Sequence, residues 1–479
     1  MKFTFRNLGL IKKAEMELKP LTVIIGPNNA NKTYIAYSIY GLMDCLSQLF
    51  SRRVFARPFR EPGDSVYWKA SLQELRLDLQ LSVATELNSF ERDLPAFFQD
   101  SSGRLFADTK YGVEFSQDEL KFAITALSGK PIVGFTGTYD AIVDEETVTL
   151  SPVSGGKTLP FQGTSDETFI DKRLGVEMLT SISHELFSRP YLLPAERNAL
   201  VITYKVLANR RLKLMLDAQR RLFTGRKKTE ESTQRQLEIF REAGEVRYPQ
   251  PVEDFLELLF EIENSNPDEG KREIRRTVRR PPGDSTPQSH IATLADEIER
   301  NMQNGNKIGF RRTALGGREI MVDVGNDLNI DLYNASSSIK QLTPLLLYLR
   351  HRASPNDLII IDEPEMNLHP ESQAKLLEIL AMLVNARVKV LLTTHSPYIM
   401  AHLNNLVLLE EPKKTKKKRM AQSLYLQNPA AFLQMSAVSA YEMHDGELHD
   451  LKDPDYGIRW DTFSDVSAEL QQIYFQIHE

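Results

Sequence analysis

The sequence has almost no cysteine and no long hydrophobic run. Cys45 is the only cysteine among 479 residues, so the chain cannot form an internal disulfide, and one thiol cannot build a structural zinc site. The N-terminus, MKFTFRNLGL, lacks the apolar segment of a signal peptide, and no stretch approaches the roughly 18 apolar residues of a membrane span. These absences favour a reducing compartment, and we expect a cytoplasmic protein without a membrane partner.

A strong excess of one charge is also missing. The formal net charge is -6, with 59 lysines and arginines present, and this balance neither predicts nor excludes nucleic-acid binding. Hydrophobic residues make up 41% and charged residues 26% of the chain, as in ordinary folded proteins. At this length we expect more than one domain, or one domain that carries large insertions.

The first fifty residues predict strands, a loop and a helix. Residues 3–8 and 15–18 alternate like half-buried strands, and LTVII at 21–25 is a continuous apolar run typical of a central strand. The loop that follows, GPNNANKT, matches the phosphate-binding pattern G-x-x-x-x-G-K-[ST], except that Asn31 replaces the second glycine. This replacement is tolerable because asparagine enters the left-handed backbone region more readily than most residues.

The loop predicts a site for ATP and Mg²⁺. Its N–H groups and the N-terminus of the next helix would bind phosphate oxygens, Lys32 would reach the β and γ phosphates, and Thr33 would ligate Mg²⁺. The alternative is an Asn-rich turn without a ligand, which the position between an apolar strand and a helix disfavours. The residues predicted to bind nucleotide here are Gly26, Asn28, Asn29, Ala30, Asn31, Lys32 and Thr33.

Two later strands end in side chains that could take part in phosphoryl transfer. In LIIIDEPE, Asp362 would hold Mg²⁺ and Glu363 would orient or deprotonate the attacking water. In LLTTHSP, His395 closes an apolar strand about one βαβ unit later and would sense the γ-phosphate. The alternatives are a solvated strand end and a structural histidine. Because ligands bind at the carboxyl ends of parallel strands, we expect these groups at one sheet edge beside the loop.

The remaining pattern predicts an α/β fold of the P-loop NTPase type. Beyond residue 305 strands and helices alternate, which indicates a mostly parallel sheet covered by helices. The basic run KKTKKKR at 413–419 reads as an exposed loop. We assign residues 1–50, 189–204 and 305–479 to a discontinuous ATPase head, 51–188 to a β-rich lobe with helices, and 205–304 to a helical insertion that could form a coiled coil.

These motifs resemble those of the ATPase heads of the ABC-type superfamily, in particular its SMC, RecF and OLD-like group. The phosphate loop, DEPE followed by MNLHP, and TTHSP carry the resemblance, which covers about residues 1–50 and 310–479. In that group ATP lies between two heads, so the resemblance implies a homo-oligomer, at least a dimer of heads. It also implies that Ser336 of ASSSIKQL, as the signature serine, contacts the nucleotide of the opposite head.

The resemblance gives expectations for four further residues. Asn367 and His369 of MNLHP fall where the D-loop lies in the group, so they would contact the opposing head. Ser338 stands where the signature has glycine, and with Asn31 this implies slow or partner-controlled hydrolysis. Arg197 of PAER lies near a strand end and is either a γ-phosphate or interface contact or a salt-bridged structural arginine.

The biological role also follows from resemblance. OLD-type nucleases carry a Toprim domain after the head, whereas here about eighty residues follow TTHSP, with no clear cluster of metal-binding acids. The chain resembles stand-alone ATPases of bacterial anti-phage systems such as PARIS and Septu. This implies an ATPase sensor that controls a separate effector, expected to be a nuclease. The alternatives are a RecF- or SMC-like DNA-repair ATPase, with DNA as partner, and a weakly hydrolysing, nucleotide-gated scaffold.

Overall fold

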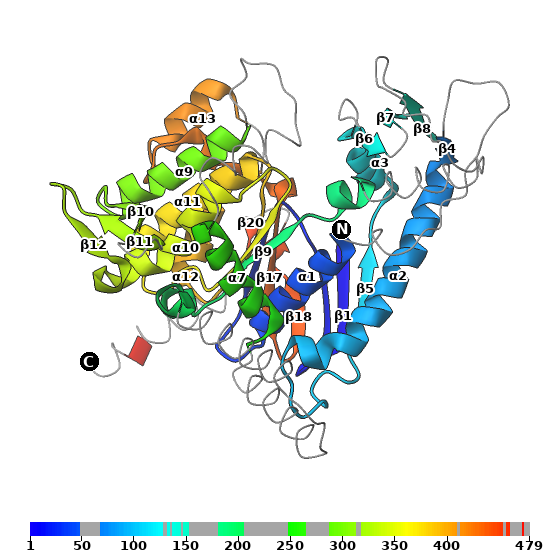
Figure 1. The fold of residues 1–479 in the computed structure, drawn as a ribbon, viewed down its shortest axis with the longest axis horizontal. Coiled ribbons are helices and arrows are strands. Elements are labelled where there is room, and N and C mark those ends of the chain that lie inside the picture. Colours follow the sequence, from blue (N-terminus) through cyan, green and yellow to red (C-terminus); the bar gives the residue numbers. More distant parts are fainter. Residues whose placement is uncertain are drawn as a thin grey trace, which may run out of the picture.

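A computed structural model of the chain describes residues 1–47, 68–127, 132–134, 137–144, 147–152, 181–205, 248–264, 287–312, 318–409, 412–453, 457–459 and 472–473. Within these residues the fold is α/β, as the sequence predicted, and its main element is a nine-stranded mixed sheet (Figure 1). Much of the predicted helical insertion, including residues 206–247 and 265–286, lies outside the described residues.

The nine strands lie in the order β5-β1-β2-β18-β17-β3-β14-β13-β9. The pairs from β17 to β9 are all parallel, whereas β5, β1 and β2 pair antiparallel, as do β17 and β18. The strands are β1 (Lys2–Leu8), β2 (Ile11–Glu17), β3 (Leu21–Ile25), β5 (Lys110–Glu114), β9 (Pro190–Leu193), β13 (Leu358–Asp362), β14 (Lys389–Thr394), β17 (Val438–His444) and β18 (Glu447–Asp450).

The central strands form where the sequence is apolar without alternation. Every residue of β3 (LTVII) and of β13 (LIIID) is buried. A parallel strand that is covered on both faces has no solvent side, so it requires such a continuous run, which also favours β-branched residues. The strands predicted at 21–25 and at LIII are therefore confirmed, and each delivers a polar segment to the carboxyl edge of the sheet.

Helices cover the sheet on both sides. Helix α1 is buried almost all round, packs against β9, β13 and β14, and approaches α2 so closely that a Cβ on Gly41 would lie 2.5 Å from Cζ of Phe90. Figure 1 shows α9 to α12 gathered on one side and α2 on the other. No helix in the described part of the chain is long and apolar enough to cross a bilayer. The helices are α1 (Lys32–Ser47), α2 (Leu72–Phe97), α3 (Gln117–Thr125), α7 (Gln250–Asn264), α9 (Pro287–Met302), α10 (Ser337–His351), α11 (Pro370–Asn385) and α12 (Pro397–Leu406).

The range 51–188 is partly continuous with the main sheet. Its strand β5 pairs antiparallel with β1 at the sheet edge, and α2 packs on both β5 and α1. The division into a head, a lobe and an insertion stays a prediction. A four-stranded sheet contains β4 (Trp68–Ser71), β6 (Ile132–Gly134), β7 (Gly137–Val143) and β8 (Thr147–Pro152). A three-stranded sheet contains β10 (Lys307–Arg312), β11 (Arg318–Asp323) and β12 (Asn329–Asp331).

The basic run at 413–419 does not form the exposed loop that its charge suggested. It lies almost entirely in helix α13 (Lys414–Ala421). Lysine, arginine, methionine and alanine have high helix propensity, and the segment contains neither glycine nor proline to interrupt it. The prediction of a loop from charge alone was therefore wrong, whereas the predicted exposure holds for most of the cationic side chains.

Replacing Asp357 with asparagine should make folding stability less dependent on pH. Burial raises the pKa of this carboxyl from 3.8 to about 7, against hydrogen bonds from the Ser354 N–H at 2.7 Å and the Tyr348 hydroxyl at 3.1 Å. The unfolded chain loses this proton first, so the wild type loses stability as pH rises from about 4 to about 7, and the loss is complete above 7. Denaturant unfolding at pH 5 and pH 8 should show a smaller difference for Asp357→Asn than for wild type. If the free energy of unfolding changed equally with pH in wild type and in Asp357→Asn, the prediction would be wrong. Asp327→Asn is the control, because Asp327 is exposed.

Candidate active site

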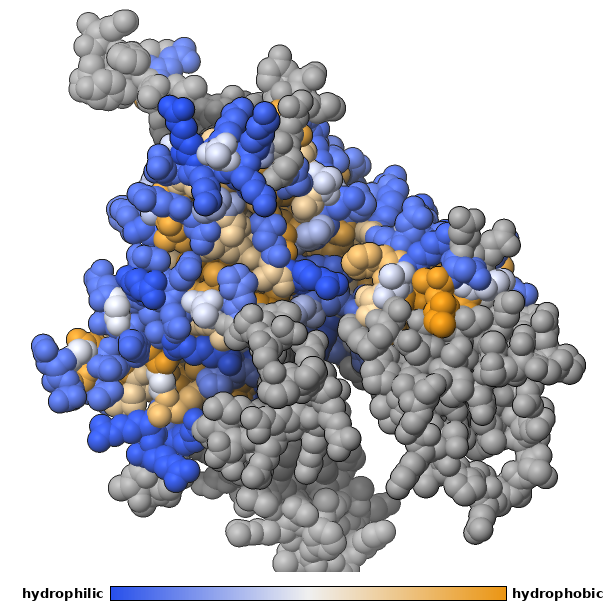
Figure 2. Space-filling view, turned by 90° about the horizontal axis from the view of Figure 1, so that it is seen from above, coloured by the Kyte–Doolittle hydropathy of each residue, from blue (hydrophilic) through white to orange (hydrophobic). Residues whose placement is uncertain are grey.

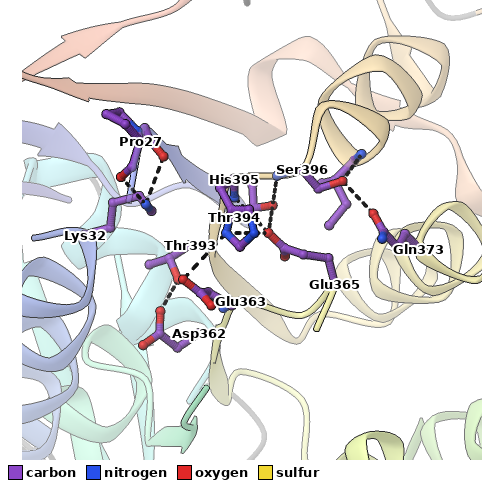
Figure 3. Close-up of polar contacts among 12 residues, drawn as sticks. Pro27, Lys32, Asp362, Glu363, Glu365, Gln373, Thr393, Thr394, His395 and Ser396 are labelled. Atoms are coloured by element: carbon purple, nitrogen blue, oxygen red, sulfur yellow. Dashed lines mark hydrogen bonds and ion pairs between the residues drawn. The ribbon is translucent and has the colours of Figure 1, made fainter. Parts of the chain in front are cut away.

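The carboxyl ends of neighbouring parallel strands meet at one edge of the sheet. The register pairs the last residue of β3 with the last residue of β14, and Thr393 of β14 with Asp362 at the end of β13. The phosphate loop, residues 26–33, comes directly after β3. His395 comes directly after β14, and Glu363 comes directly after β13. Because the three strand ends are adjacent, these three segments lie next to one another. Three motifs that lie far apart in the sequence are thus brought into one site (Figure 3).

The phosphate loop has a backbone that its glycine and asparagines allow. Asn31 has a φ of 64°, the left-handed conformation expected from the sequence, and Asn29 has a φ of 65°. Gly26 has a φ of 150°, and a Cβ there would lie 2.7 Å from the carbonyl oxygen of Met443 in β17. Only glycine fits this position without a shift of the backbone. Residues 27–29 are exposed, so the loop is open to a ligand.

Lys32 begins α1 and is buried beneath the loop. Its ammonium donates hydrogen bonds of 2.9 Å to the carbonyl oxygens of Gly26 and Pro27 (Figure 3). Burial lowers the pKa of Lys32, and the carboxylates that follow β13, Glu363 first, act in the opposite direction. An anion that reached this ammonium would favour its charged form further. The side chain is therefore placed to pair with a phosphate.

Asp362 links β13 to the phosphate loop. It is 2% exposed; its Oδ2 accepts from the Thr33 hydroxyl at 3.0 Å, and its Oδ1 accepts from the Thr393 hydroxyl. Burial raises the pKa of Asp362, while the two hydroxyl hydrogen bonds lower it. Thr33 and Asp362, predicted as metal ligands from separate motifs, are thus in direct contact.

The donor set fits Mg²⁺ bound together with a nucleotide. Hydroxyl and carboxylate oxygens suit Mg²⁺, which binds proteins through one or two carboxylates and completes its shell with water and substrate phosphates. In the parts of the chain that the structure describes, no three His, Cys, Asp or Glu side chains converge as a metal site. Thr33 and Asp362 would therefore hold the ion together with phosphate oxygens of a nucleotide bound at the adjacent loop.

Glu363 has an uncommon backbone conformation. Its φ is 48°, in a left-handed region that costs a non-glycine residue on the order of 1–3 kcal/mol. The Glu363 N–H donates to the carbonyl of Thr393 at 3.1 Å and to its hydroxyl at 3.2 Å. Its carbonyl accepts from Nη2 of Arg197 at 3.1 Å. These contacts hold the strained turn, and the side chain stays 28% exposed at the site.

His395 lies between two carboxylates. Its Nδ1 is 3.6 Å from Oε1 of Glu363 and 3.4 Å from Oε1 of Glu365. Glu365 also accepts from the Thr394 hydroxyl at 2.7 Å and the His395 N–H at 2.8 Å. Among the described residues, Nδ1 of His395 and Oε2 of Glu365 are buried atoms without a hydrogen-bond partner. Such atoms are rare in folded proteins and need an explanation, and here the missing hydrogen bonds could be supplied by a ligand or a water at the site.

The residues expected to face a second head lie outside this cluster. Ser336 is the exposed N-cap of α10; its hydroxyl accepts from the Ile339 N–H at 3.4 Å and lies 3.0 Å from the hydroxyl of Ser338. Ser338 lies within the helix, so the glycine of the family pattern is not needed for its conformation. Asn367, with a φ of 58°, and His369, the N-cap of α11, are both exposed.

Arg197 faces the protein interior. It is 3% exposed, and its Nη1 donates to the carbonyl oxygens of Asp362 at 2.7 Å and Pro194 at 2.9 Å. Burial lowers the pKa of Arg197 to about 10. Of the two sequence-based interpretations the structural one fits, with carbonyl oxygens rather than a carboxylate as the partners.

Sequence reasoning missed three residues that organise the site. Thr393 contacts both Asp362 and Glu363, and Glu365 binds the turn after β14. Their signal was present in the motifs, as the first threonine of TTHSP and the second glutamate of DEPE. Gln373 accepts from the Ser396 hydroxyl at 2.5 Å and donates to the Leu368 carbonyl at 3.0 Å. No local pattern distinguished it from other helix residues.

Together the fold and this site define the class: the chain is a P-loop ATPase domain. It matches the protein family described as "AAA domain, putative AbiEii toxin, Type IV TA system" over residues 21–401, and it belongs to that family. No curated protein matches the chain in sequence.

Solved structures of SMC heads show a distant likeness. The Smc head domain with an extended coiled coil bound to the C-terminal domain of ScpA, from Pyrococcus furiosus, is 14% identical over 98% of both chains, with a TM-score of 0.33. An SMC head bound to the C-winged helix domain of ScpA is 13% identical over 94% of this chain and 96% of that one, with a TM-score of 0.35. The SMC head domain from Thermotoga maritima is 10% identical over 94% and 97%, with a TM-score of 0.30. These scores are low, so the assignment depends on the family match and the site.

Asn31→Gly should preserve ATP binding, whereas Asn31→Val should weaken it at least tenfold. Glycine adopts a φ of 64° without cost, but a β-branched residue there is strained by about 1–2 kcal/mol. Titration with a fluorescent ATP analogue and thermal unfolding would measure both effects. Exposed Asn304, with a φ of 53° in a turn outside the site, is the matched control, because Asn304→Val should lower stability alone. Equal ATP affinity in Asn31→Val and wild type would contradict the role of the loop.

Proposed function

We propose that this chain binds and hydrolyses ATP as the sensor ATPase of a bacterial anti-phage defence system. The observation that carries the ATPase part is the convergence of Lys32, Asp362 and Glu363 at one sheet edge. Lys32 follows the loop after β3, the two acids lie at the end of β13, and both strands are neighbours of β14. The defence part is supported by the family description, which names a toxin of a type IV toxin–antitoxin system. The roles of sensor and of a separate effector, expected to be a nuclease, are taken from the resemblance to stand-alone defence ATPases.

The residues divide the work of phosphoryl transfer. The loop N–H groups and Lys32 bind the phosphates and neutralise their charge. Glu363 orients the attacking water and accepts its proton, and His395 donates a hydrogen bond to the γ-phosphate from one ring nitrogen. Mg²⁺, held by Thr33 and Asp362, would supply further charge neutralisation at the phosphates. The reaction produces ADP and phosphate.

Three exposed residues support the head-to-head assembly that is part of this proposal. The recorded hydrogen bonds of Ser336 and His369 stay within their own helix turns, and Asn367 is exposed beside His369. These groups therefore remain accessible to a second copy of the chain. Because isologous dimers present the same surface on both copies, each head would complete the nucleotide site of the other.

A DNA-repair ATPase is the second candidate, and helix α13 favours it. The helix lies near the top of Figure 1, and the view from above in Figure 2 shows a mainly hydrophilic surface on this side of the molecule. Clustered exposed cations attract nucleic-acid phosphates, and such binding weakens steeply with salt. The cationic residues of this run that are exposed are Lys413, Lys414, Lys416, Lys418 and Arg419.

ATP turnover should fall by about 10²–10⁴-fold in Glu363→Gln, because general base catalysis is lost. ATP binding should persist in this variant, whereas Lys32→Ala should lose binding as well. Release of phosphate and equilibrium binding of ATP would be measured for each protein. Glu114→Gln is the matched control, since Glu114 is exposed at the end of the edge strand β5.

The same assay separates the candidate functions when duplex DNA is added. The proposal expects modest or no stimulation of turnover and uncut DNA, because the effector is a separate protein. Strong, salt-sensitive stimulation would favour repair. Tight ATP binding without turnover would favour the nucleotide-gated scaffold, and absence of ATP binding would refute an ATPase altogether.

ATP should convert Glu363→Gln from monomer to dimer, because the variant binds but does not consume the nucleotide. Adding Ser336→Arg in this background should prevent the dimer, since a large cation would replace the exposed cap residue at the interface. Sedimentation velocity with and without ATP and Mg²⁺ would measure the change. Exposed Ser101→Arg is the control, and a dimer that is insensitive to ATP or to Ser336→Arg would contradict head-to-head assembly.

A further inference from the structure

All five N–H donors of Arg197 are occupied when the Gln341 amide takes the orientation that satisfies its own oxygen and nitrogen. Nε donates to the Gln341 carbonyl at 3.3 Å, Nη1 donates to the carbonyls of Pro194 and Asp362, and Nη2 donates to the Glu363 carbonyl. With the Gln341 amide oxygen turned toward the guanidinium, Nη2 also donates to it at 2.5 Å. A guanidinium has five such donors and no acceptor. No donor remains for a phosphate, so Arg197 does not act by touching ATP.

The partners of Arg197 belong to three separate segments. Pro194 follows β9, Asp362 and Glu363 are the last residue of β13 and the first residue after it, and Gln341 lies in α10. A flat, rigid fork of donors fixes the relative position of these backbones in a way that the single ammonium of lysine cannot reproduce. The arginine thus joins the helix that Ser336 caps to the turn that carries Glu363.

Helix α10 lacks one backbone hydrogen bond beside this contact. Pro344 lies inside the helix and has no N–H for the carbonyl of Lys340, four residues earlier. Gln341, which lies between these two residues, is 1% exposed and contacts Arg197 through both its carbonyl and its side chain. This turn of α10 is therefore held by the arginine as well as by its own helical ladder.

We propose that Arg197 is a positioning residue that transmits the position of α10 to Glu363. Glu363 has a strained φ of 48°, so its turn keeps this shape only while its backbone contacts persist. Docking of a second head against Ser336 would act on α10, and the guanidinium would pass any displacement to the carbonyls of Asp362 and Glu363. The inference rests on the proposed function and adds a regulatory connection between the interface and the attacking-water position.

The test compares Arg197→Lys with Arg350→Lys. Arg350 is also on α10 and donates to Glu299 at 2.7 Å and to the Ile308 carbonyl at 2.9 Å, so its replacement makes the same chemical change away from the site. We expect Arg197→Lys to lower kcat at least tenfold with the ATP dissociation constant within about threefold of wild type. Arg350→Lys should leave kcat within about threefold. Turnover would be normalised to the number of ATP sites, so that only folded protein is counted.

A double-mutant cycle shows whether Arg197 acts through Glu363. In the Glu363→Gln background, Arg197→Lys should cause no further loss of turnover. Gln341→Leu, which keeps the arginine and removes one acceptor, should lower kcat less but in the same direction. Additive losses in the cycle, a loss of ATP affinity with unchanged kcat, or equal kcat in Arg197→Lys and Arg350→Lys would overturn the inference. Absence of turnover in wild type would instead overturn the proposed function.

Discussion

Parallel pairing of β3, β14, β13 and β9 is the constraint on which the site depends. Each pairing register places one strand end next to another, so the loop, the histidine, the acidic turn and the arginine meet without any of them being close in sequence. A shift of one residue in any register would move the polar turn out of line with its neighbours and send every side chain to the other face of the sheet. Because every residue of β3 and β13 is buried, the shifted side chains would have to pack against a different close-packed layer.

The site keeps its charges on neutral partners. The Lys32 ammonium binds two carbonyl oxygens, Arg197 binds carbonyl and amide oxygens, and Asp362 binds two hydroxyls. Burial without partners would be expensive for each group, and pairing the charges with one another would occupy them. Hydrogen bonds to neutral groups reduce the desolvation cost while Lys32 and Asp362 stay able to interact with a charged ligand. This is the electrostatic preorganisation that phosphoryl transfer requires.

Local chemistry made much of this predictable from sequence. The apolar runs of β3 and β13 predicted central strands. The positive φ of Asn31 was expected because asparagine tolerates the left-handed backbone region. What could not be predicted depends on contacts across the sequence. The φ of 48° at Glu363 is held by Thr393 and Arg197, and both contacts join segments that are separated in the sequence. Likewise, β5 pairs with β1 across about a hundred residues of intervening chain. Helix α13 was not predicted because a run of lysines is equally typical of exposed loops.

Strand β3, which delivers the phosphate loop, has its second neighbour near the other end of the chain. It pairs with β17 as well as with β14, and a buried contact of 3.0 Å between the hydroxyls of Thr22 and Ser439 joins residues 417 positions apart. Gly26 is also shaped by the β17 carbonyl of Met443. Contacts of such long sequence separation form late, because the loop-closure entropy of the intervening chain must be overcome first. During synthesis on the ribosome, the phosphate loop therefore remains unfinished until the chain has been made past β17. A chain that stops before β17 lacks the strand that borders β3 and shapes Gly26, so the proposed nucleotide site cannot be completed without it.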